Sequence, residues 1–164
     1  MSLYKAYLNN IAEREEKGLH PKPIDSGELI KEIIDHVIDK KSEQRKKCLE
    51  FLIYNTLPGT TAAALIKSKF LKNIIFENIK INEISVSFAL ELLSHMKGGP
   101  SIKVLLNIAL GNNTSLAQKA SKILMRQVFL YESDIEQLKV AFNQGNTIAK
   151  KIITSYANAE FFSN

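Results

Sequence analysis

The chain has a single cysteine, Cys48, among 164 residues. One thiol cannot form a disulfide within the chain, and a charge-rich sequence without a secretory leader is typical of a reducing compartment. Long apolar runs are also missing, because stretches such as Ile74-Ile75-Phe76 are far shorter than the about 20 residues that cross a bilayer. These absences predict a soluble, cytoplasmic protein with no membrane partner.

Patterns that carry catalysis or bind cofactors are missing as well. An iron–sulfur cluster needs at least three cysteine thiolates, so this chain cannot hold one. Gly98-Gly99 and Gly145 lack the strand-to-helix context of a phosphate-binding loop. The histidines are far apart and none stands in a metal-ligand spacing with Cys48; they are His20, His36 and His95. We therefore predict no catalytic, metal-binding or cofactor-binding residue in this chain.

Cys48 and His95 have ordinary structural interpretations. Cys48 stands next to Leu49 on an apolar helix face, where a cysteine behaves as a small hydrophobic side chain, and no base that could activate it is visible. His95 precedes a Gly-Gly-Pro turn, where a protonated imidazole interacts favourably with the end of a helix. We expect a core thiol and a helix-terminal histidine.

The length and the charge of the chain narrow the class of protein further. A chain of this size can bury roughly 70% of its unfolded surface, which suffices for one domain over residues 1–164. The net charge is +5, and residues 51–126 hold nine basic and three acidic side chains whereas residues 1–50 hold ten of each. A basic surface attracts phosphates, so Lys119, Lys122 and Arg126 are candidate nucleic-acid contacts. A solvated helix face is the more ordinary interpretation, because no aromatic residues are interleaved with these cations.

Apolar residues recur at helical spacing almost throughout, which predicts an all-α protein with about nine helices joined by short turns. Gly18 ends the first helix near Lys17, and Pro21 and Pro23 make residues 18–24 a stiff connector. The second helix should end near Lys41. Residues able to cap a helix start predict the remaining boundaries; they are Asp25 with Glu28, Ser42, Thr60 or Thr61, Ser85, Thr114, Ser133 with Glu136, and Gly145-Asn146.

The same spacing predicts the core. Expected core positions include Ile30, Ile33, Cys48, Leu52, Leu65, Leu71, Leu105, Leu124, Val128, Leu138, Phe142 and Ile152. Helix pairs that begin near residues 26, 60, 100 and 132 repeat at roughly 35 residues, which is in the range of helical repeats. The pattern predicts an irregular stack of helix pairs.

Three segments, in this order and spacing, carry a family resemblance: residues 18–25 (GLHPKPID), 93–100 (LSHMKGGP) and 149–162 (AKKIITSYANAEFF). Between them lies the segment 54–59 (YNTLPG). From about Tyr4 to Phe162 the chain resembles the N-terminal domain of the bacterial aconitate hydratase B family, the aconitate hydratase 2 and 2-methylisocitrate dehydratase enzymes. The resemblance implies a HEAT-like α-solenoid, a right-handed superhelix of stacked antiparallel helix pairs.

The resemblance also implies a function. The parent enzyme of the tricarboxylic acid cycle interconverts citrate and isocitrate through cis-aconitate, and its [4Fe–4S] cluster and catalytic residues would belong to downstream domains. The family's N-terminal domain is implicated in dimerisation, in a channel toward the active site, and in an iron-linked switch to messenger RNA binding. The implied partners are those downstream domains, a second copy, other metabolic enzymes and messenger RNA.

Three interpretations therefore stay open. The chain is a non-catalytic interaction domain of a longer enzyme, an RNA-binding module that uses its basic middle third, or a stand-alone helical scaffold. Tyr156, Phe161 and Phe162 fit either of two roles: they pack on the preceding helix, or Phe161 and Phe162 dock against a following domain.

Overall fold

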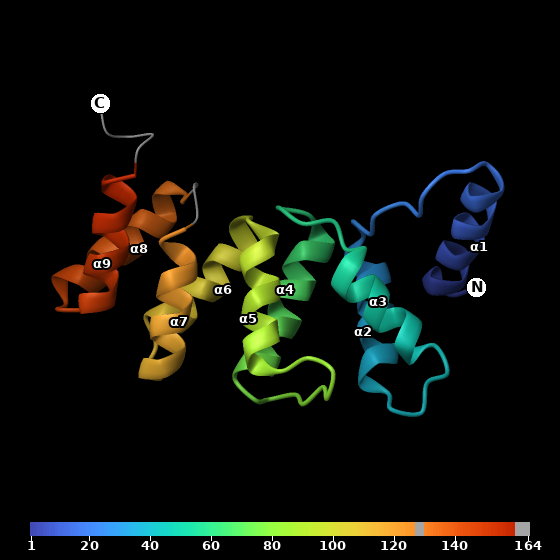
Figure 1. The fold of residues 1–164 in the computed structure, drawn as a ribbon, viewed down its shortest axis with the longest axis horizontal. Helices are drawn as coiled ribbons and strands as arrows, with labels where there is room; N and C mark the ends of the chain where they lie inside the picture. Colours follow the sequence, from blue (N-terminus) through green and yellow to red (C-terminus); the bar gives the residue numbers. More distant parts are fainter. Residues whose placement is uncertain (127–129, 160–164) are drawn as a thin grey trace. The chain divides into compact units, whose positions relative to one another are not determined.

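The computed structural model describes residues 1–126 and 130–159, and in these residues the chain forms nine α-helices (Figure 1). This confirms the all-α prediction. The helices are α1 (Leu3–Glu16), α2 (Gly27–Ile38), α3 (Arg45–Tyr54), α4 (Ala62–Ile75), α5 (Val86–Met96), α6 (Gly99–Ala109), α7 (Thr114–Leu124), α8 (Glu132–Asn143) and α9 (Thr147–Ala157). Val128, Phe161 and Phe162, for which we predicted core or docking roles, lie outside the described residues.

The contacts divide the chain into two compact units, Met1–Leu92 and Leu93–Asn164, and the boundary falls within α5. In the first unit α2 packs against α1, α3 and α4; in the second α6 packs against α7, and α8 against α9. Consecutive helices thus pair inside each unit, as a stack of helix pairs requires. The single domain and the right-handed superhelix stay predictions.

Helix α2 is the centre of the first unit. Its residues Leu29, Ile30, Ile33, Ile34 and Val37 are all buried and recur at the spacing of one helix face. Each such side chain contributes about 1.5–3 kcal/mol when it leaves water. Ser26 caps this helix by accepting a hydrogen bond from Leu29 N at 3.3 Å.

Helix α1 is held on α2 by polar and aromatic contacts. The Glu32 carboxylate of α2 accepts hydrogen bonds from Leu3 N at 3.1 Å and from Tyr4 N at 2.8 Å, which satisfies two N–H groups at the start of α1. Tyr4 and Tyr7 are buried, and the Tyr7 ring meets Phe51 edge-on with centroids 5.3 Å apart. The buried stripe of α1 was expected, whereas the role of Glu32 was not.

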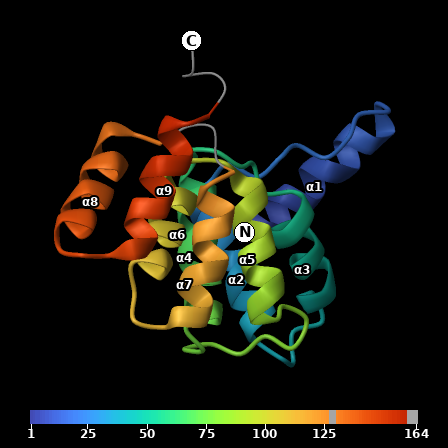
Figure 2. The ribbon, with the colours of Figure 1, turned by 60° about the vertical axis from the view of Figure 1, so that its left-hand side comes forward.

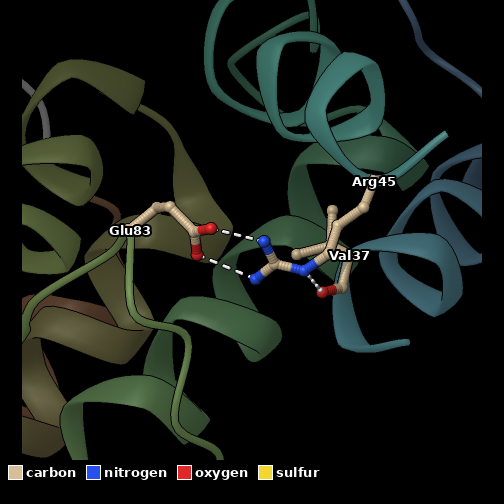
Figure 3. A network of polar contacts seen from close by, with 3 residues as sticks. All are labelled: Val37, Arg45 and Glu83. Carbon is tan, nitrogen blue, oxygen red and sulfur yellow. Dashed lines mark hydrogen bonds and ion pairs between the residues drawn. The ribbon is translucent and has the colours of Figure 1, made fainter. Parts of the chain in front are cut away.

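The start of α3 is tied to the end of α2 and to the loop before α5. The Arg45 guanidinium binds both carboxylate oxygens of Glu83, one of them at 2.8 Å, and Arg45 Nε donates to the Val37 carbonyl at 2.9 Å (Figure 3). Glu83 follows Ile81 and precedes Ile84, both of which are buried. The loop is therefore anchored by apolar side chains and by one bidentate ion pair.

In the second unit α7 also packs against α9, and α6 against α8 (Figure 2). Its buried centre contains Leu105, Leu106, Ile108, Leu124, Leu138 and Ile152. Gly99 allows a close approach to Tyr131, because a Cβ at Gly99 would lie 2.9 Å from Tyr131 Cε2.

Three predicted helix caps are wrong. Asp25 does not cap α2, because Ser26 stands at the N-cap and its hydroxyl accepts from Leu29 N. Ser42 does not cap α3, since its hydroxyl pairs with His36 Nδ1 at 2.8 Å in the preceding turn. Thr114 is the first helical residue of α7, and the Asn113 side chain before it accepts from Leu116 N.

The predicted capping box of Ser133 and Glu136 is displaced by two residues. The Asp134 carboxylate accepts from Tyr131 N at 2.9 Å, and Asp134 is buried. Because the Asp134 carboxylate already accepts from the N–H group at the start of α8, Glu136 is not needed as a cap. Glu136 instead pairs with Lys139 at 3.2 Å. The caps predicted at Thr61 and Asn146 are confirmed.

Two predicted core residues are exposed. Leu65 and Phe142 each keep 42% of their surface in solvent. On α4 the buried face runs through Ala64, Phe70 and Leu71, so Leu65 falls beside it. The end of α2 was also placed too late, since it lies at Ile38 rather than near Lys41.

Candidate interaction surfaces

Two of the segments that carry the resemblance lie side by side. The extended connector after α1 and the turn after α3 form a parallel β-bridge between Ile24 and Thr56. Ile24 N donates to the Asn55 carbonyl at 2.8 Å, and Leu57 N donates to the Ile24 carbonyl at 2.8 Å. Residues about 30 positions apart in the sequence are thereby joined by backbone hydrogen bonds.

The Tyr7 hydroxyl is hydrogen-bonded to both of these segments, and we refer to the Ile24–Thr56 bridge and its surroundings as the junction. This hydroxyl donates to the Lys22 carbonyl at 2.8 Å and accepts from Asn55 Nδ2, which also donates to the Lys22 carbonyl at 3.3 Å. Burial raises the pKa of Tyr7, while the hydrogen bond from Asn55 opposes the rise. Both segments are therefore held rigidly against α1.

An exposed aromatic residue stands next to this junction. Tyr54, the last residue of α3, has 81% of its surface in solvent, and Leu57 and Pro58 after it are also exposed. Tyrosine is enriched at positions that dominate protein–protein binding. The sequence marked this segment only as a motif, and its exposure next to a rigid junction makes it a candidate contact with a protein partner.

The basic middle third is not one surface, because Lys67 of α4 is 5% exposed. Its Nζ donates to the Ile53 carbonyl at 3.3 Å, close to the end of α3 where a cation is favourable. Burial lowers the pKa of Lys67 to about 8. Lys67 is therefore an internal residue and cannot contribute to a solvated basic face.

The three candidate nucleic-acid contacts do come together. Lys119 and Lys122 on α7 and Arg126 just after it are exposed, and their spacing of three and four residues places them on one side. This side lies opposite the buried residues Ala117, Ala120 and Leu124. We refer to Lys119, Lys122 and Arg126 as the α7 cation row.

Cys48 is fully buried, as expected of a core thiol. Burial raises its pKa, and its hydrogen bond with Tyr4 acts in the opposite direction. His36 lies nearby, with its ring centroid 5.2 Å from that of Tyr4 and its Nδ1 against the Ser42 hydroxyl. Since that hydroxyl also accepts from Gln44 N, the His36–Ser42 contact serves the turn between α2 and α3.

The other histidines stay apart from this cluster. The His20 backbone carbonyl accepts from Arg14 Nε at 2.7 Å, and His95 is an exposed residue in the last turn of α5. Across residues 1–126 and 130–159, no three His, Cys, Asp or Glu side chains gather in a way that could hold a metal ion. Nor does any helix in this part of the chain combine the length and the apolar character needed to cross a membrane.

Two pockets lie on the described surface. One of about 530 Å³ lies in the first unit between Ile74 and Val86, and its rim carries Glu77 and Lys80. One of about 450 Å³ lies in the second unit, where Leu110 and Val140 meet Gln137 and Gln144. Neither pocket contains a nucleophile with an adjacent base, so neither supports a catalytic assignment.

The profile of the Aconitate B N-terminal domain matches residues 6–162. The chain is 29% identical to aconitate hydratase B of Escherichia coli (strain K12) over 164 residues, 27% identical to that of Helicobacter pylori (strain J99) over 158, and 24% identical to that of Synechocystis over 162. These alignments cover 99%, 96% and 99% of this chain but 18% of each relative's length. The chain belongs to the aconitate B N-terminal domain family.

Proposed function

We propose that this chain is the non-catalytic interaction domain of an aconitate hydratase that interconverts citrate and isocitrate through cis-aconitate. The family match over residues 6–162, with coverage of 18% of relatives called aconitate hydratase B, is the observation that carries the proposal. The catalytic residues and the [4Fe–4S] cluster belong to downstream domains in this proposal. Its single buried thiol suits a reducing, cytoplasmic setting.

The domain would act through protein contact. Its partners would be the downstream domains, a second copy or another metabolic enzyme, and its position would shape access to the active site. The exposed Tyr54, held beside the Ile24–Thr56 bridge, supports a protein-binding role because a rigid aromatic side chain loses little conformational entropy on binding.

The test compares a full-length aconitate hydratase that carries this domain with the same enzyme after deletion of the domain. Sedimentation should show altered assembly, or kcat/KM for citrate should fall, while the iron–sulfur absorbance is kept. Unchanged assembly together with unchanged kinetics would reject the proposal. Tyr54→Ser should reproduce part of the effect, and Phe142→Ser, which changes another exposed aromatic residue, is the matched control.

RNA binding is the second candidate function, and the α7 cation row favours it. Three phosphate contacts on a single strand should make log affinity fall with log salt with a slope of about −2. Lys119→Glu combined with Lys122→Glu should abolish binding. An unchanged RNA affinity in that double variant would exclude this surface.

A further inference from the structure

The described carboxylates of the second unit all lie on one helix. In its described residues, 93–126 and 130–159, there are eight Lys or Arg and three Asp or Glu, all three on α8. Asp134 is buried against Tyr131 N, and Glu136 pairs with Lys139. Helices α6, α7 and α9 therefore carry lysines and no carboxylate at all.

The lysines of these helices are exposed. Helix α7 packs against both α6 and α9 (Figure 2), and Lys103 of α6 and Lys150 and Lys151 of α9 are exposed. The α7 cation row runs over seven residue steps, from Lys119 to Arg126, which is about 10 Å along a helix axis. Successive positions in the row are three and four residues apart, a rise of about 4.5 and 6 Å along a helix axis. Both are shorter than the Debye length of about 8 Å, and the fields of charges at such a spacing add.

The first unit is different although it has more charged residues. It holds fourteen basic and thirteen acidic side chains, and its lysines stand among carboxylates. Lys31, for example, lies between Glu28 and Asp35 on α2. The first unit therefore carries a net charge of +1 (14 − 13), whereas the described residues of the second unit carry +5 (8 − 3).

We propose that the α7 cation row binds small multivalent carboxylate anions and raises their concentration at the protein surface. The inference rests on the proposed function for the identity of the anion, since aconitate is a tricarboxylate. Attraction to a cation row scales with the number of charges on the ligand, so the row prefers tricarboxylates to dicarboxylates and monocarboxylates.

The composition of the helices favours a small anion over a nucleic acid. Single-strand binders interleave aromatic residues with their cations so that bases can stack. Helices α6 and α7 contain no aromatic residue. The row also consists mainly of lysines, which act as point charges without the fork that suits bidentate phosphate recognition.

The experiment titrates the isotopically labelled 164-residue chain with tricarballylate, glutarate and acetate at one fixed ionic strength and neutral pH, and follows its amide resonances. We expect saturable shifts at residues 114–126, with affinity in the order tricarballylate, glutarate, acetate. For the trianion, each cation removed should weaken binding about fivefold, by Coulomb attraction across about 6 Å with screening.

Two matched triple variants test the location. Lys119→Gln, Lys122→Gln and Arg126→Gln together should abolish the shifts, whereas Lys31→Gln, Lys40→Gln and Lys41→Gln should preserve them, and both sets change exposed residues. Equal shifts with all three anions, or shifts that survive the α7 substitutions, would overturn the inference. Much tighter binding of a short oligouridine at the same salt would assign the row to RNA and overturn it as well.

The test of this inference can be distinguished from the test of the proposed function. Deletion of the domain from the full-length enzyme tests the interaction role, whereas the titration tests the isolated chain. Loss of enzyme assembly on deletion, together with no valence preference in the titration, would leave the proposed function standing and remove this inference.

Discussion

Arg45 and Glu83 form a bidentate ion pair across 38 residues of sequence, and the same guanidinium holds the Val37 carbonyl through Nε (Figure 3). One side chain thus joins the end of α2, the start of α3 and the loop before α5. The hydrogen bonds from Arg45 lower the pKa of Glu83 to about 2. The ion pair is bidentate, but the Glu83 side chain is exposed. The pair therefore contributes little to the free energy of unfolding.

Glu83→Gln should lower the free energy of unfolding by about 0.5–1 kcal/mol at neutral pH. Because the folded pKa of Glu83 lies below its unfolded value, the stabilisation is present above the unfolded pKa of about 4.3 and is lost as pH falls toward about 2. Urea unfolding of both proteins across this window is the measurement. A difference that stays constant down to pH 2 would contradict the ion-pair explanation.

Lys67→Met should raise the free energy of unfolding at pH 7. Burial of the Lys67 ammonium destabilises the folded protein by up to about 3 kcal/mol, judged from the fall of its pKa to about 8. The substitution also removes the hydrogen bond to the Ile53 carbonyl, which reduces the gain by about 1 kcal/mol. We therefore expect a gain of about 1–2 kcal/mol.

The gain should depend on pH in a defined direction. The folded pKa of Lys67 lies below its unfolded value of 10.5, so the unfolded chain binds the extra proton, and wild-type stability rises between pH 8 and 10.5. The difference between the two proteins should therefore shrink over this range. Lys69→Met changes an exposed neighbour and is the control; an equal gain there would show that added hydrophobicity alone explains the effect.

Tyr7→Phe should cost about 1 kcal/mol, because it removes the donor to the Lys22 carbonyl and the acceptor for Asn55. The junction should loosen before the whole unit unfolds. Amide hydrogen exchange at Ile24 and Leu57, whose N–H groups form the bridge, should accelerate. Tyr54→Phe removes an exposed hydroxyl and should leave both rates unchanged; acceleration in both variants would refute a specific role for Tyr7.

Glu77→Gly and Lys97→Gly should each stabilise the protein by about 1 kcal/mol. Glu77 has φ of 58° and Lys97 has φ of 46°, in the left-handed region that glycine adopts without a steric penalty. Thermal unfolding of each single variant measures the effect. Lys103→Gly, inside α6, should instead destabilise by about 1 kcal/mol, and stabilisation by all three would rule out the backbone explanation.

Much of the fold could be predicted because an amphipathic helix carries its buried face in its own spacing. The buried stripe of α2 and the burial of Cys48 follow from residues within a few turns of one another. The α7 cation row is predictable for the same reason, since intervals of three and four residues place side chains on one face. These features need no knowledge of what the helix packs against.

The spacing alone could not decide which of two neighbouring polar residues caps a helix. Asp25 and Ser26 can both cap a helix, and Ser26 does so in the structure, while the Asp25 carbonyl accepts from Ala63 N in a different helix. Spacing also could not distinguish Leu65 from Leu71, because which apolar residues are covered depends on where the neighbouring helices lie.

By itself, then, the sequence determined the helices, most of their inward faces, the row of cations on α7 and the family to which the chain belongs. Only the tertiary structure placed the connector at Ile24 beside Thr56, buried Lys67 at the end of α3 and left Tyr54 in solvent. The physical reason is that the periodicity of apolar side chains along a helix depends only on residues close together in the sequence. Contacts between distant segments depend instead on which backbone and apolar groups remain unsatisfied after the helices have formed.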